Sequence, residues 1–141
     1  MSYITRTDLL DALSEQQLVQ LTDDDKLGIA DETKISKAIT DADAEINGYI
    51  ATRYAVPITP ATDLVKKFSK TIAVKNLWAR RQRVPETVRQ DYDDVVAQLR
   101  DIAKGVITLG VDPAPAESAK SSAGEVSGPE RVFDRDKLGG F

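Results

Sequence analysis

The chain has 141 residues, a net charge of −4, and neither cysteine nor histidine. Disulfide and thiolate chemistry is therefore excluded, and the usual general base and commonest transition-metal ligand are missing, so we expect a protein that is not an enzyme and needs no metal or other cofactor. No run of about eighteen apolar residues predicts a transmembrane helix, and the first residues lack the pattern of a secretory signal, so we expect a soluble, cytoplasmic protein.

The charges are divided unevenly along the chain. Residues 1–60 carry eleven acidic and five basic side chains, whereas residues 61–83 carry one acidic and seven basic side chains. A molecule with one acidic and one basic surface attracts copies of itself head to tail. A basic helix also suits contact with nucleic acid, and a solvated helix face is the third alternative.

Two short helices begin the predicted fold. Thr7 is expected to cap the first, and the capping-box pattern from Ser14 to Gln17 predicts the start of the second. Residues 22–28 then read as a solvated acidic loop or as a surface for a basic neighbour. They do not form a calcium loop, because Leu27 and Lys34 stand where oxygen ligands are required.

Three longer helices follow, each with apolar residues at helical period. The first is predicted from about 33 to 52, with Asp43 on its polar face. Gly48 in this helix either allows another backbone to approach or is simply tolerated. Pro57 and Pro60 predict an extended connection. The next helix runs from about 61 to 82 and contributes Trp78, the single tryptophan, to the core.

The third long helix is expected to have Pro85 in its first turn and to end at Gly105. Residues 106–110 then form a short extended piece closing over the core. Asp91, Asp93 and Asp94 on this helix are read as a solvated face and not as a metal site, because no second acidic motif converges with them.

The basic helix carries the first group of candidate contacts. They face either a neighbouring subunit or DNA in a channel. A helix-turn-helix is not supported, because this helix follows a proline-rich connection and the rest of the chain is acidic. The candidates are Lys66, Lys67, Lys70, Arg80, Arg81 and Arg83.

The composition changes after residue 110. Residues 111–128 are rich in Pro, Ala, Ser and Gly and predict a flexible linker, and residues 129–141 then alternate large apolar and charged side chains. A segment at the end of a tether does not bury such side chains by itself, so we predict docking onto a partner, with folding back onto its own domain as the alternative. The candidate docking residues are Arg131, Val132, Phe133, Arg135, Lys137, Leu138 and Phe141.

Together these patterns predict an all-α protein. Residues 1–110 form a small helical bundle of three longer helices and short N-terminal helices, followed by an extended C-terminal tail. From the residues alone, one function that fits is a small DNA-binding regulator or packaging accessory that uses the helix at 66–83.

Four segments carry a resemblance to a known family. They are residues 3–9 (YITRTDL), 41–50 (DADAEINGYI), 53–57 (RYAVP) and 131–141 (RVFDRDKLGGF). In combination they resemble small proteins of Mu-like phages and prophages, which are similar to the head–tail connector (adaptor) proteins of long-tailed phages.

The resemblance implies a structural virion protein that joins the capsid to the tail. Such proteins form a ring of about twelve copies under the portal, assemble in the host cytoplasm, and end in the virion neck. The implied partners are the portal protein, other neck or tail-terminator proteins and further copies of the chain, with transient contact with passing DNA and no membrane. The tail would reach onto the portal or a neighbouring subunit.

Overall fold

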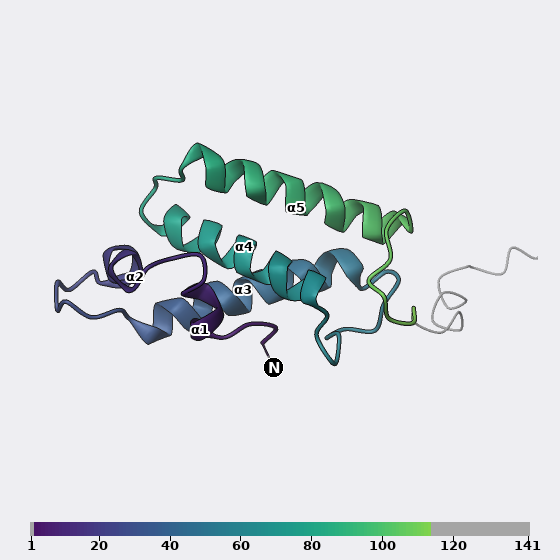
Figure 1. Cartoon of the computed structure of the whole chain (residues 1–141), viewed down its shortest axis with the longest axis horizontal. Coiled ribbons are helices and arrows are strands. Elements are labelled where there is room, and N and C mark those ends of the chain that lie inside the picture. The colour runs from purple at the N-terminus through teal and green to yellow at the C-terminus, as the bar shows by residue number, and fades with distance from the viewer. Residues whose placement is uncertain (1, 114–141) are drawn as a thin grey trace, which may run out of the picture.

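The computed structural model describes residues 2–113, which form five α-helices and, within that range, no strand (Figure 1). The predicted all-α class is therefore confirmed. The linker beyond residue 113 and the segment 129–141 lie outside the described residues. The helices are α1 (Arg6–Leu9), α2 (Glu15–Thr22), α3 (Glu32–Ile50), α4 (Asp63–Arg80) and α5 (Glu86–Lys104).

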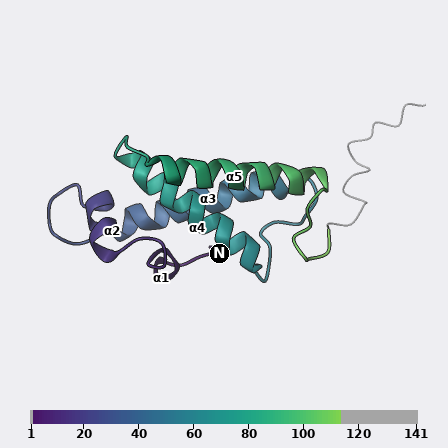
Figure 2. The same ribbon diagram turned by 45° about the horizontal axis from the view of Figure 1, so that its top comes forward.

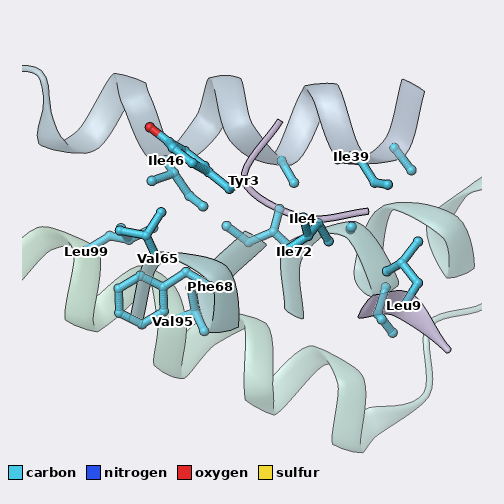
Figure 3. Close-up of a cluster of buried hydrophobic side chains, with 14 of the residues drawn as sticks. Tyr3, Ile4, Leu9, Ile39, Ile46, Val65, Phe68, Ile72, Val95 and Leu99 are labelled. Carbon is cyan, nitrogen blue, oxygen red and sulfur yellow. The ribbon is translucent and has the colours of Figure 1, made fainter. Parts of the chain in front are cut away.

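The three long helices make the body of the bundle. α4 packs against both α3 and α5, while α1 and α2 pack against α4 (Figures 1 and 2). Their facing surfaces share one core, in which Ile46, Phe68 and Leu99 come from α3, α4 and α5 and are fully buried (Figure 3). Tyr3 and Ile4 add the N-terminal segment to this core. The apolar stripes of the sequence therefore mark the buried faces.

The sequence predicted the N-terminal cap of α2 correctly but not that of α1. Thr5, and not Thr7, precedes α1, because the carboxylate of Asp8 accepts a hydrogen bond from the Thr5 N–H at 2.7 Å. The capping box of α2 is confirmed. The Ser14 N–H donates to the Gln17 side chain at 3.0 Å, and the Gln17 N–H donates to the Ser14 hydroxyl at 3.2 Å.

The termini of α3 and α5 are also set by caps. α3 begins slightly earlier than predicted, because the carboxylate of Asp31 accepts a hydrogen bond from the Thr33 N–H at 2.9 Å. Pro85 lies just before α5 and not in its first turn, since its ψ of 146° is extended. Gly105 ends α5 in the left-handed region, with a φ of 88°, as predicted.

α4 is slightly shorter than predicted. The Thr62 hydroxyl accepts a hydrogen bond from the Val65 N–H at 3.3 Å, and the helix ends at Arg80, before Gln82 adopts a φ of 54°. Trp78 is only partly buried and packs at the edge of the core, so its prediction as a core residue holds in part.

Two connections close the bundle at one end. The Val56–Pro57 and Thr59–Pro60 peptide bonds are cis, and Ile58 between them is buried. Residues 106–110 form no strand, but Leu109 is buried, so this segment covers the core as expected. Of the two interpretations of Gly48, the close approach of another backbone is wrong and a tolerated glycine is left: apart from the adjacent backbone of α3 itself, no described atom lies within 4 Å of the position that a Cβ would take.

Candidate partner-binding surfaces

The basic side chains at the C-terminal end of α4 form ion pairs with Asp24 of the same chain. The carboxylate of Asp24 lies 2.7 Å from Lys34 Nζ, 2.9 Å from the Arg80 guanidinium and 3.2 Å from that of Arg81. Hydrogen bonds from Lys34 and Arg80 hold the pKa of Asp24 down at about 2. The acidic turn was predicted to be solvated or to face a basic neighbour, but at Asp24 it meets basic residues of its own chain.

The same two arginines cap the C-terminal end of α2. Arg80 donates to the carbonyl of Leu21 at 2.7 Å, and Arg81 donates to the carbonyls of Gln20 and Asp23 at 3.1 and 3.2 Å. Guanidinium groups at a helix C-terminus satisfy carbonyls that have no partner within the helix. Arg80 and Arg81 therefore stabilise the fold, and the sequence alone did not reveal this role.

The remaining basic candidates are divided between the two ends of α4. Lys70 forms an ion pair with Asp11 at 3.2 Å. Within residues 2–113, Lys66, Lys67 and Arg83 form no ion pair. At 1.5 Å per residue, α4 rises about 20 Å from Lys67 to its end at Arg80, and Arg83 follows that end. The three side chains left for a partner therefore do not form one continuous basic patch.

A buried carboxylate ties the N-terminal segment to the bundle. Asp43 accepts hydrogen bonds from the Tyr3 N–H at 3.0 Å and from the Ser69 hydroxyl at 2.6 Å. The Tyr3 hydroxyl donates to the Asn47 side chain and accepts from the Ile58 N–H at 3.0 Å. Asp43 was predicted on the polar face of α3 but is buried, because a carboxylate with such partners can leave water.

Arg53 and Tyr54 fix the point at which the chain leaves α5. The Arg53 guanidinium donates to the Ile102 carbonyl at 3.4 Å and occupies the space beside Gly105, where a Cβ would lie 2.8 Å from its Nη1 atom. The Tyr54 hydroxyl accepts a hydrogen bond from the Leu109 N–H at 3.2 Å. Residues 102–109 are therefore held in place just before the chain continues toward its C-terminal segment.

A loop with exposed apolar side chains lies at the end of the molecule opposite to residues 102–109. Residues 23–31, here called the acidic loop, connect α2 to α3 and extend beyond the helices (Figure 1). Leu27 and Ile29 in this loop are 70% and 65% exposed. Neither residue was predicted to bind a partner, although two large apolar residues in an acidic turn were a signal that could have found them.

A shallow hollow of about 290 Å³ lies beside the two cis prolines. We call it the proline pocket. Its walls are mostly apolar and a lysine lies in its lining. It was not foreseen from the sequence, because its walls come from segments far apart in the chain. The residues that line it include Tyr3, Pro57, Ile58, Thr59, Pro60 and Lys66.

Neither a metal centre nor a membrane span emerges from the described residues. Asp91, Asp93 and Asp94 are exposed on α5, and no three acidic side chains within residues 2–113 converge to hold a metal ion. Every helix in this range is too short or too polar to cross a membrane. The predicted docking residues lie outside the described residues; they are Arg131, Val132, Phe133, Arg135, Lys137, Leu138 and Phe141.

Comparison with known proteins connects the chain to phage Mu. The family model described as "Bacteriophage Mu, Gp36" matches residues 3–127. The chain is similar to the Mu-like prophage FluMu protein gp36 of Haemophilus influenzae, with 30% identity over 113 residues that cover 79% of this chain and 77% of the relative. It is also similar to gene product J of Escherichia phage Mu, with 28% identity over 141 residues that cover 99% of both chains.

Proposed function

Because the chain belongs to the bacteriophage Mu Gp36 family, we propose that it is a head–tail connector, a structural and non-enzymatic protein of the virion neck. Copies assemble in the host cytoplasm into a ring of about twelve under the portal, which joins the capsid to the tail. The partners are the portal protein and other neck or tail-terminator proteins.

The observation that carries this proposal is the fixed exit of the chain from α5. Arg53 holds the end of the helix, and Tyr54 holds Leu109. A segment with apolar side chains, residues 129–141, then follows in the sequence. A rigid body with a defined exit and an apolar terminal segment suits an adaptor that docks onto a larger partner, and repetition around a ring multiplies one weak contact through effective concentration.

The charge distribution supports an adaptor more than a DNA-binding regulator. Arg80 and Arg81 already bind Asp24 and the end of α2, and Lys70 binds Asp11. A regulator needs a continuous basic surface to neutralise several phosphates. Lys66, Lys67 and Arg83 serve contacts with a neighbouring subunit or with DNA that passes through the ring.

Electron microscopy of a phage that lacks this gene tests the proposal. We expect DNA-filled or leaking heads beside complete but unattached tails, and we expect the full chain supplied in trans to restore joined virions. The chain without residues 129–141 should fold but should not restore them. Joined virions in the absence of the gene would refute the connector function.

A matched pair of variants tests the docking segment itself. Replacing Phe133 and Leu138 with serine removes two apolar anchors, and we expect loss of portal binding in a pull-down with purified portal. Replacing Asp134 and Asp136 with alanine changes the same segment without removing an apolar group. If both variants bind the portal as the native chain does, the anchors have been assigned wrongly.

The DNA-binding alternative has its own measurement. Binding of duplex DNA by the purified full chain should be weak and should differ little between the native protein and a variant with alanine at Lys66, Lys67 and Arg83. Tight binding that decreases steeply with salt and is lost in this variant would favour the regulator.

A further inference from the structure

We propose that the acidic loop of one copy inserts Leu27 and Ile29 into the proline pocket of a second copy, so that copies join end to end. The inference rests on the proposed function for its setting, a ring of copies, and it identifies a contact between them.

The acidic loop presents its apolar side chains on a preformed backbone. The carboxylate of Asp23 accepts hydrogen bonds from the N–H groups of Leu27 and Gly28 at 2.9 and 2.7 Å, which closes the turn. Asp24 is in turn bound by Lys34, Arg80 and Arg81. Leu27 and Ile29 are nevertheless 70% and 65% exposed. A loop held in one shape loses little entropy when its apolar residues are buried against a partner.

The proline pocket offers a fixed apolar surface of suitable size. Its volume of about 290 Å³ exceeds that of two aliphatic side chains, and its walls include Pro57, Pro60 and Ile58. The Ile58 N–H donates to the Tyr3 hydroxyl at 3.0 Å, and the Tyr3 N–H is bound by the buried Asp43. The pocket is therefore held open by the same hydrogen bonds that pin the N-terminal segment.

The acidic loop carries four aspartates and one lysine, Lys26, so its net charge is opposite to that of Lys66 beside the pocket. Asp25 in the acidic loop is exposed and forms no ion pair within residues 2–113, and the same is true of Lys66 in the lining of the pocket. A partner that brought a basic loop would place like charges beside Lys66, whereas an acidic loop is attracted to it. The complementary occupant that this chain itself provides is the acidic loop of another copy.

The positions of the two surfaces define the kind of assembly. The acidic loop projects at one end of the long axis, and the 56–60 connection lies toward the other end (Figures 1 and 2). One copy therefore uses its loop while its own pocket stays available to the next copy. Such a heterologous contact does not stop at a dimer, and it closes into a ring when the rotation between copies permits.

Cysteine cross-linking of the full chain tests the contact, because the natural chain has no cysteine. Ile29→Cys places a thiol in the loop, and Thr59→Cys places one at the pocket. Under mild oxidation at high protein concentration, we expect a mixture of the two single variants to give disulfide-linked dimers and no larger species. A variant that carries both changes should give a ladder of higher oligomers.

Two outcomes would overturn the proposal in different ways. Dimers of Ile29→Cys alone would mean that two loops meet in a symmetric contact. Capture of Thr59→Cys by Phe133→Cys, and not by Ile29→Cys, would mean that the C-terminal segment occupies the proline pocket.

Serine variants test whether the apolar side chains drive the contact. Replacing Leu27 and Ile29 with serine, in chains that carry Lys26→Cys and Thr59→Cys, should lower the yield of the ladder about tenfold or more. Val106→Ser is the matched control, because Val106 is 73% exposed but lies outside the loop and the pocket lining. An equal loss in the control would contradict a specific contact.

The same cross-link in phage particles separates this inference from the proposed function. If particles contain the variant with Ile29→Cys and Thr59→Cys and oxidation gives no ladder, the contact is wrong while the virion function stands. If the chain is absent from particles, the connector function is wrong, and the result with the purified protein decides the contact by itself.

Discussion

At the scale of single residues, Asp43 shows how a polar side chain can be essential to the packing. It lies in α3 among buried apolar neighbours and is bound by the Tyr3 N–H and the Ser69 hydroxyl. Hydrogen bonds to a charged acceptor are the stronger kind, and a buried donor that loses its acceptor is costly. Asp43 is therefore one of the residues that hold the N-terminal segment on the bundle, and it links this segment to both α3 and α4.

Replacing Asp43 with alanine should lower the free energy of unfolding by about 2–4 kcal/mol, because two buried donors lose their acceptor. Urea unfolding of the full chain measures this. Asp41→Ala is the control in the same helix, since Asp41 is exposed and pairs only with Lys37, and its effect should stay within about 0.5 kcal/mol. Equal effects of the two changes would mean that the Asp43 hydrogen bonds contribute little.

Replacement of glycine by alanine should change the free energy of unfolding in opposite directions at Gly48 and Gly105. Gly48→Ala should raise the free energy of unfolding by about 0.5–1 kcal/mol, because the site is helical and open. Gly105→Ala should lower it by about 1–2 kcal/mol, because its φ is 88° and the new Cβ would meet Arg53. Thermal unfolding of both variants measures the difference. A stabilised Gly105→Ala would contradict the close approach of Arg53.

At the scale of helices, the Asp24 cluster joins the end of α2 to the end of α4. The Asp24 pKa of about 2 in the folded chain lies below the ordinary aspartate value of 3.8. Because the pKa of Asp24 is lower in the folded chain than in the unfolded chain, its carboxylate stabilises the fold at every pH above the unfolded pKa. This stabilisation is lost as the pH falls from about 4 to about 2. Acid unfolding monitored by circular dichroism should therefore depend less steeply on pH in Asp24→Asn than in the native chain. An unchanged acid transition would mean that the cluster does not stabilise the fold.

The sequence predicted the helices better than the contacts between them. Apolar periodicity identified α3, α4 and α5, and Ser14 and Gly105 marked helix ends, because these signals are local. Asp43 and Arg80 were assigned to solvated or partner-facing surfaces. Their partners, Tyr3 and Leu21, lie about forty and sixty residues away, and only the packed bundle brings these groups together. Whether a polar side chain is buried therefore depends on tertiary contacts, and the periodicity of apolar residues gives no information about them.

At the scale of the whole molecule, much of the charge asymmetry in the sequence is neutralised internally. The acidic first half and the basic α4 meet at Asp24 and at Asp11, so the two surfaces expected for head-to-tail attraction are smaller than composition implied. Among the charged side chains that form no ion pair within residues 2–113 are Asp25 at one end and Lys66 toward the other. Because exposed ion pairs are weak, these charges select and orient a partner, while the apolar side chains of the acidic loop supply the affinity.

A charge exchange tests this division of roles. Lys66→Glu should reduce self-association of the full chain about two- to fivefold, measured by sedimentation velocity in low salt, and adding Asp25→Lys should restore it because the pair is re-formed with reversed sign. Lys67→Glu changes the net charge equally but lies outside the pocket lining, so it should have the smaller effect. Both differences should shrink in high salt, since exposed pairs are screened. If Asp25→Lys worsens association in the Lys66→Glu background, the acidic loop does not face the proline pocket, and the end-to-end contact has a different geometry.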